Sequence, residues 1–73
     1  MALERVEVPI TGKILAVNVG VGDKVKEGDV LCIIESMKME NPILAPMDGR
    51  IKEVGAQAGK VMQSGELVAV IEY

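Results

Sequence analysis

Apolar and polar residues alternate along two stretches near the start of the chain, Leu3–Val8 and Lys13–Val19. A period of two predicts β-strands with one buried face and one face in water. Two continuous apolar runs, Val30–Ile34 and Leu67–Ile71, instead predict strands that are covered on both faces. No stretch has the periodicity of an amphipathic helix, and the spacing of the glycines would break a long one. The pattern therefore predicts an all-β protein.

Turn-forming residues separate these segments at close and even intervals. They fall at Pro9–Gly12, Gly20–Asp23, Gly28-Asp29, Pro46–Gly49, Gly55–Gly59 and Ser64-Gly65. The segments between Gly22 and Gly28, and between Gly59 and Gly65, each leave room for a very short strand. The chain is therefore expected to hold up to eight short strands, which is typical of a β-sandwich or flattened barrel.

The second half of the chain repeats the first half at an offset of 37 residues, without a gap. Eight of 27 aligned positions are identical: Pro9/Pro46, Gly12/Gly49, Ile14/Ile51, Val17/Val54, Gly22/Gly59, Gly28/Gly65, Ile34/Ile71 and Glu35/Glu72. Two copies are too few for a solenoid, which needs at least about three repeats. We therefore expect two copies that share one core around an approximate two-fold axis.

The connector between the two copies predicts a β-hairpin with Met37-Lys38 as its two-residue turn. The facing pairs are then Ser36/Met39, Glu35/Glu40, Ile34/Asn41 and Ile33/Pro42. Because bonded and non-bonded pairs alternate away from the turn, Pro42 falls at a non-bonded position, where its missing N–H costs this ladder nothing.

This hairpin breaks two local rules. Two-residue hairpin turns favour Gly or Asn at positions with φ > 0, so Met37 and Lys38 imply strain of about 1 kcal/mol or more. Glu35 opposite Glu40 places like charges side by side. Rules broken at one place in an otherwise regular chain indicate a functional site, with a tolerated surface loop as the plain alternative.

Composition excludes several classes of function. The 73 residues suffice for one domain and include no His, Phe or Trp, with Tyr73 as the one aromatic residue. Without His, the usual general base at neutral pH is missing, and we expect no catalytic residues. A net charge of −3 without stacking aromatics is unlike a nucleic-acid-binding protein. Cys32 alone supports neither an internal disulfide nor a metal site, and its apolar run suggests a small core residue.

The chain carries no recognisable membrane or export segment. No apolar run approaches the roughly 18 residues of a membrane span, so we expect no direct membrane insertion. Residues 1–5 lack the apolar core of a signal peptide. The expected compartment is the cytoplasm, or an organelle matrix if a transit peptide has been removed. The start at Met1, with no Pro/Ala-rich linker, suggests a stand-alone small subunit or a trimmed C-terminal domain of a larger carboxylase.

The connector also carries a resemblance. Glu35-Ser36-Met37-Lys38-Met39-Glu40 resembles the biotin-attachment motif of biotin carboxyl carrier domains, in the biotin/lipoyl attachment family, whose centre is Met-Lys-Met. The resemblance runs from about residue 6 to 72, through Pro9, Gly12, Gly22-Asp23, Val25, Gly28, Leu31, Asn41-Pro42-Ile43 and Ala45–Gly49. It implies a single biotinyl domain over residues 1–73. Its fold would be a flattened barrel of two four-stranded antiparallel sheets with quasi-two-fold symmetry.

The resemblance implies that biotin is attached to Lys38, flanked by Met37 and Met39. Glu35 and Glu40 are candidate charges for recognition by biotin protein ligase, with solvated flank charges as the plain alternative. The implied partners are that ligase, a biotin carboxylase using ATP and bicarbonate, and a carboxyltransferase or decarboxylase. The loaded arm would carry an activated carboxyl group between these enzymes.

The residues themselves indicate a carrier and not an enzyme. An exposed lysine amine is almost wholly protonated at neutral pH, since its reference pKa is about 10.4. The chain therefore does not activate its own nucleophile, and a separate ligase has to remove the proton.

Two other classes of protein remain open at this point. One is a lipoyl carrier, whose tip usually reads Asp-Lys-Ala or similar, so that Met37 and Met39 favour biotin. The other is a barrel of the same type that carries nothing and links other proteins as an adaptor. The mass of the adduct distinguishes a lipoyl carrier from a biotin carrier. A native complex that stays fully active with Lys38→Ala would indicate the adaptor.

Overall fold

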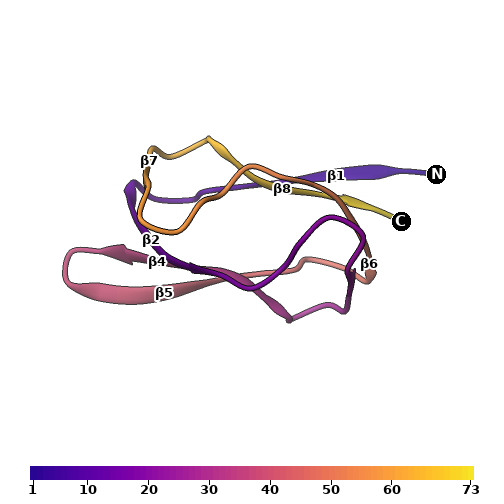
Figure 1. Cartoon of the computed structure of the whole chain (residues 1–73), viewed down its shortest axis with the longest axis horizontal. Coiled ribbons are helices and arrows are strands. Elements are labelled where there is room, and N and C mark those ends of the chain that lie inside the picture. The colour runs from indigo at the N-terminus through magenta and orange to yellow at the C-terminus, as the bar shows by residue number, and fades with distance from the viewer.

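The computed structural model describes all 73 residues as an all-β molecule with eight strands and no helix (Figure 1). The strands are β1 (Leu3–Glu7), β2 (Gly12–Val17), β3 (Lys24–Val25), β4 (Val30–Ser36), β5 (Met39–Leu44), β6 (Gly49–Val54), β7 (Val61–Met62) and β8 (Leu67–Glu72). The very short strands expected between the paired glycines are β3 and β7. The structure therefore has no helix that is long and apolar enough to cross a membrane.

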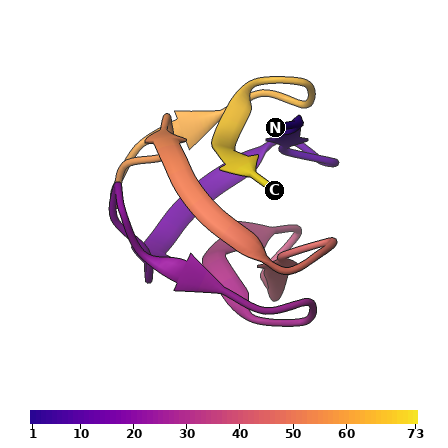
Figure 2. The same ribbon diagram turned by 90° about the vertical axis from the view of Figure 1, so that its right-hand side faces the viewer.

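The eight strands form two four-stranded sheets that share one interior (Figure 2). The first sheet has the order β1-β8-β6-β3 and the second the order β5-β4-β2-β7, with all neighbours antiparallel. Each sheet combines strands from both halves of the chain, since β8 and β6 join β1 and β3. The expected fold class, a flattened barrel of two four-stranded antiparallel sheets, is confirmed.

The internal repeat is visible in the hydrogen bonds as well as in the strands. Adding 37 to the residue numbers places β2, β3 and β4 on β6, β7 and β8, and converts the order of one sheet into that of the other. The N–H of Gly22 donates to the carbonyl oxygen of Ile51 at 2.8 Å, and that of Gly59 donates to Ile14 at 2.7 Å. Each half thus bonds to the other in the same way, as expected for quasi-two-fold symmetry.

Three sequence-based expectations need correction. The strand predicted over Leu3–Val8 ends at Glu7, because the N–H of Val8 turns away to donate to Glu66 O at 2.9 Å. The strand predicted over Lys13–Val19 is Gly12–Val17, because the chain enters a turn that Gly20 and Asp23 stabilise. In β4, Leu31, Cys32 and Ile34 are fully buried, but Val30 and Ile33 are only half-buried on the outer face. The prediction that β4 is covered on both faces is therefore wrong for this chain by itself.

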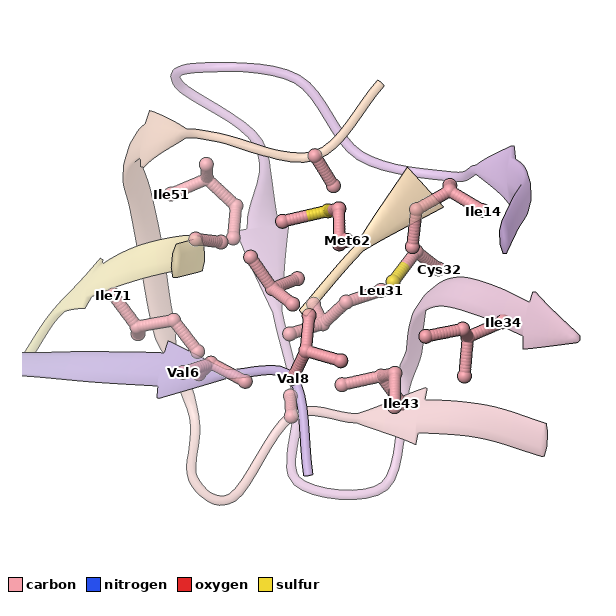
Figure 3. Packing of buried hydrophobic residues seen from close by; sticks show 14 of the residues in the cluster. Val6, Val8, Ile14, Leu31, Cys32, Ile34, Ile43, Ile51, Met62 and Ile71 are labelled. Carbon is pink, nitrogen blue, oxygen red and sulfur yellow. The ribbon is translucent and has the colours of Figure 1, made fainter. Parts of the chain in front are cut away.

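One cluster of fifteen buried side chains fills the space between the sheets (Figure 3). Its members are mostly Val, Ile, Leu and Ala, and no charged or polar residue is buried. These small branched side chains suit two closely spaced sheets. Within the first sheet, β6 and β8 approach so closely that a Cβ on Gly49 would lie 2.5 Å from Cγ2 of Ile71 and 2.6 Å from the carbonyl oxygen of Glu72.

The molecule is elongated, with extents of 37 × 18 × 16 Å, and its two ends differ. At one end the hairpin of β4 and β5 projects beyond the rest of the structure (Figure 1). At the other end the two termini lie side by side, and Ala2 and Tyr73 exchange two backbone hydrogen bonds of 2.7 and 2.9 Å. By the repeat, Tyr73 corresponds to Ser36 and Ala2 to Met39. The termini thus occupy the place that corresponds to the hairpin. The hairpin occurs once, because the chain is continuous there only between the first copy and the second.

Candidate functional site

The projecting hairpin has the register that the sequence predicts. Its facing pairs are Ser36/Met39, Glu35/Glu40, Ile34/Asn41 and Ile33/Pro42. Met37 and Lys38 form the two-residue turn at its end. The structure therefore places Lys38 in the turn at the projecting end of the hairpin, at one end of the long axis (Figure 1).

The turn is strained in the way its sequence implies. Met37 has φ = 54° and Lys38 has φ = 64°, and no other non-glycine residue of the chain has a positive φ. Two consecutive positive values define a type I′ turn, which matches the twist of the flanking strands. Left-handed backbone costs a non-glycine residue roughly 1–2 kcal/mol, so the long β4–β5 pairing has to stabilise it. The side-chain amide of Asn41 donates to the carbonyl oxygen of Met39 at 3.2 Å and fixes the end of the turn.

The side chains at the tip are open to solvent. Lys38 is exposed, Met37 is 92% exposed and Met39 is 65% exposed. The two ion pairs of the structure, Arg5–Glu7 and Lys52–Glu72, do not involve Lys38. The lysine amine makes no hydrogen bond to the chain and is free to enter a site on another protein.

A short row of charges crosses the outer face of the second sheet just behind the tip. Glu35 faces Glu40 on β5, as expected, and faces Lys13 of β2 on its other side. The neighbouring cation moderates the repulsion between the two carboxylates. Sequence reasoning missed Lys13. The repeat contained a signal, because Lys13 and Glu35 align with Arg50 and Glu72, which also face each other in the structure.

Other chemically reactive groups lie away from this tip. Cys32 is fully buried, and burial raises the pKa of its thiol, which keeps it protonated and inert. No group of three or more Cys, Asp or Glu side chains is arranged to hold a metal ion. A shallow groove beside Met1, Val25 and Tyr73 lies at the end of the molecule with the termini. The hairpin tip is therefore the site at which chemistry is to be expected.

The donor group and its setting fit a covalently attached prosthetic group. A primary amine is free and exposed on a stiff hairpin, and the flexible thioethers of Met37 and Met39 lie on either side of it. Such a site can be acylated by another protein and can then carry the attached group into a further site. Fold and site together define a carrier domain.

Comparison with known proteins assigns this carrier domain to a family. A family model described as "Biotin-requiring enzyme", of the biotin/lipoyl type, matches residues 4–71. The chain belongs to this family. The expected family and fold are confirmed, and so, at the level of the family, is biotin as the cofactor.

Individual relatives agree with this assignment. The chain is 46% identical over 68 residues to the "Biotinylated protein TB7.3 homolog" of Mycobacterium leprae, covering 93% of this chain and 96% of that protein. It is 42% identical over 64 residues to the mitochondrial propionyl-CoA carboxylase alpha chain of Homo sapiens, covering 88% of this chain but 9% of that protein. The crystal structure of the Kluyveromyces lactis urea carboxylase contains a domain with a TM-score of 0.89 and 33% identity, covering 99% of this chain and 6% of that one. This chain is thus a biotinyl domain homologous to a small part of these large carboxylases.

Proposed function

We propose that this chain is a biotin carboxyl carrier in which Lys38 bears the biotin through an amide bond. The observation that carries the proposal is the free, exposed amine of Lys38 at a strained tip between Met37 and Met39, in a member of a biotin-requiring family. The structure offers no comparable lysine, because the other lysines lie on strands and turns of the barrel body.

Loading is an acyl transfer to Lys38. The Nζ of Lys38 attacks the carbonyl carbon of biotinyl-adenylate, so that a C–N bond forms while the C–O bond to phosphate breaks. AMP leaves with the bonding electrons. Nζ gives up one proton from its ammonium form before the attack and a second proton as the amide forms. Since one positive charge disappears, the formal net charge changes from −3 to −4.

No side chain of this protein takes the proton that Nζ has to lose before the attack. The chain has no His, and no carboxylate is bonded to Lys38. A separate biotin protein ligase therefore supplies the base and the activated acid. For this reason we propose that the chain is a substrate and carrier and not a catalyst.

The tip residues adapt to more than one partner. Thioether side chains are flexible and polarisable, so Met37 and Met39 can contact differently shaped entrances. Glu35 and Glu40 give the flank of the hairpin a negative potential that favours partners with basic entrances.

Bound biotin supplies a ring nitrogen that holds a carboxyl group in transit from a biotin carboxylase to a carboxyltransferase or decarboxylase. The barrel contributes tethering and accuracy. A short flexible tether keeps an attached group at a local concentration in the millimolar range. The rigid hairpin limits the space that Lys38 explores.

Intact mass spectrometry tests the proposal directly. The chain is co-expressed with the biotin protein ligase of its own organism, and we expect a mass gain of one biotinyl group per chain. Lys38→Arg should abolish the gain, because an arginine side chain is too weak a nucleophile to be acylated. Lys60→Arg, at another exposed turn lysine, is the matched control and should be loaded in full. A lipoyl mass, or biotin on the Lys38→Arg chain, would contradict the proposal.

A further inference from the structure

The internal repeat provides a comparison within one molecule. The outer faces of the two sheets have the same backbone and the same pairing, related by the offset of 37 residues. Only one of these sheets carries the hairpin. Differences between the two outer faces therefore reflect what each face has to contact, and not what the fold requires.

The two faces differ in character at corresponding positions. In the hairpin sheet, Ala16, Ile33 and Pro42 form one row across β2, β4 and β5. The corresponding row of the other sheet is Glu53, Val70 and Arg5. The central residue is apolar in both sheets, but both of its neighbours change from apolar to charged.

The same change occurs at two further flanking positions. Leu15 of the hairpin sheet corresponds to Lys52, and Leu44 corresponds to Glu7. On the charged face Arg5 pairs with Glu7 at 3.7 Å. The hairpin sheet therefore carries an apolar flank, which we define as Leu15, Ala16, Val30, Ile33, Pro42 and Leu44.

The apolar flank is open to solvent where its counterpart is covered. Leu15 is 38% and Leu44 is 47% exposed, and Ile33 is half-buried. Val70, which corresponds to Ile33, is only 7% exposed beneath its charged neighbours, whose aliphatic stems shield apolar surface. The continuous apolar run of β4 is the pattern of a strand covered on both faces, and in the chain by itself one cover is missing.

The apolar flank is continuous with the tip. Among the rows that face outward, the row through Ile33 and Pro42 is followed by the row of Lys13, Glu35 and Glu40. A protein seated on this flank would meet two carboxylates and one amine at the base of the turn. Its surface has to be apolar at the centre and predominantly basic towards Lys38.

We propose that the apolar flank is the docking surface for the ligase that acylates Lys38. The proposal rests on the proposed function, which makes the bare amine the group to be reached. An enzyme that acts on an unmodified lysine has to approach within the length of one side chain, so it contacts the strands behind the turn. Enzymes that act on the loaded arm can lie farther from the turn, because the attached cofactor adds its own length to the lysine side chain. The negative charge of Glu35 and Glu40 complements a basic entrance.

The test exchanges the flank for the residues of the other sheet. The variant Leu15→Lys/Leu44→Glu introduces the side chains found at the corresponding positions 52 and 7 and leaves the net charge unchanged. The control Val21→Lys/Leu3→Glu places the same two charges at exposed apolar residues outside the flank, 70% and 57% exposed. Each chain is titrated as substrate of the purified ligase of its own organism, at saturating biotin and ATP.

We expect the flank variant to raise the KM for the chain by about 10- to 100-fold. This ratio corresponds to losing the burial of one or two leucine side chains against the ligase. The kcat should stay within about twofold, because ground-state and transition-state binding are weakened alike. The control should match the wild type. Thermal unfolding verifies that each chain is folded, and the two single variants are assayed as well.

A second measurement does not depend on acylation of the variant. The Lys38→Arg chain should inhibit loading of the wild type competitively, and adding the flank changes should remove this inhibition. If the wild type is loaded but the flank variant keeps its KM, the docking proposal fails while the carrier function stands. Self-association of the wild type that the flank changes abolish, with KM unchanged, would assign the flank to a second copy and overturn the proposal. If the wild type is not loaded at all, the carrier function itself fails.

Discussion

Met37 and Lys38 are consecutive residues with left-handed backbone, at φ = 54° and 64°, and together they reverse the chain between β4 and β5. Glycine would adopt this geometry without a steric penalty, yet neither position has one. The side chains at the turn are thus retained against the preference of the backbone, as expected where their contacts with other proteins matter.

Relief of this strain is measurable. Met37→Gly should stabilise the fold by about 0.5–1 kcal/mol, the strain removed less the entropy that glycine loses on folding. Met37→Val should destabilise it, because a β-branched residue fits φ > 0 poorly. Met39→Gly is the control, in a strand without positive φ, and should lower stability. Urea unfolding followed by circular dichroism measures all three, and a stability order of Val above Gly at position 37 would refute the assignment of strain.

The close approach of β6 and β8 at Gly49 predicts a second result. Gly49→Ala places a Cβ 2.5 Å from a side-chain carbon of Ile71 and 2.6 Å from a carbonyl oxygen, so neighbouring strands have to shift. We expect a loss of about 1–3 kcal/mol in the free energy of unfolding. Gly20→Ala is the matched control, since its nearest neighbour is 3.9 Å away and its φ is not positive. Equal stability of the two variants would show that the approach is not tight.

Cys32 predicts a pH dependence. Burial raises the pKa of its thiol above the ordinary value of 9.0, so the folded state binds a proton that the unfolded state releases. The stability that the protonated thiol contributes is complete below the ordinary pKa of the unfolded state. It is lost as pH rises through the raised pKa of the folded state. Under reducing conditions, the free energy of unfolding should fall from about pH 9 upward. Cys32→Val should lack this component, and parallel pH profiles for both chains would contradict the prediction.

The charge row behind the tip predicts opposite effects of two neutralising changes. Glu40→Gln removes a like-charge contact with Glu35 and should stabilise the fold by a few tenths of a kcal/mol. Lys13→Gln removes the opposing cation and should destabilise it by a similar amount. Both effects should shrink in 1 M salt, where screening acts within roughly 3 Å. Unfolding curves at low and high salt measure the difference, and equal signs for both variants would rule out the electrostatic explanation.

Much of this architecture could be predicted because it is encoded by local patterns. The offset of 37 residues is a property of the sequence, and it already implies two equivalent halves. The register of the hairpin follows from the length of its turn and from the position of Pro42, because a two-residue loop leaves one pairing. Lys38 at the tip is a direct consequence of that register.

The tertiary structure alone decided which surfaces are covered. The apolar run of β4 resembles that of β8, but Val70 is buried and Ile33 is not, because the neighbours of each residue come from strands distant in the sequence. Lys13 is 22 positions from Glu35, and only the pairing of β2 with β4 brings them together. Local patterns determine where strands and turns form, since each depends on a few adjacent residues. The exposure of a face and the charge beside a site depend on which strands become neighbours, which only the folded chain determines.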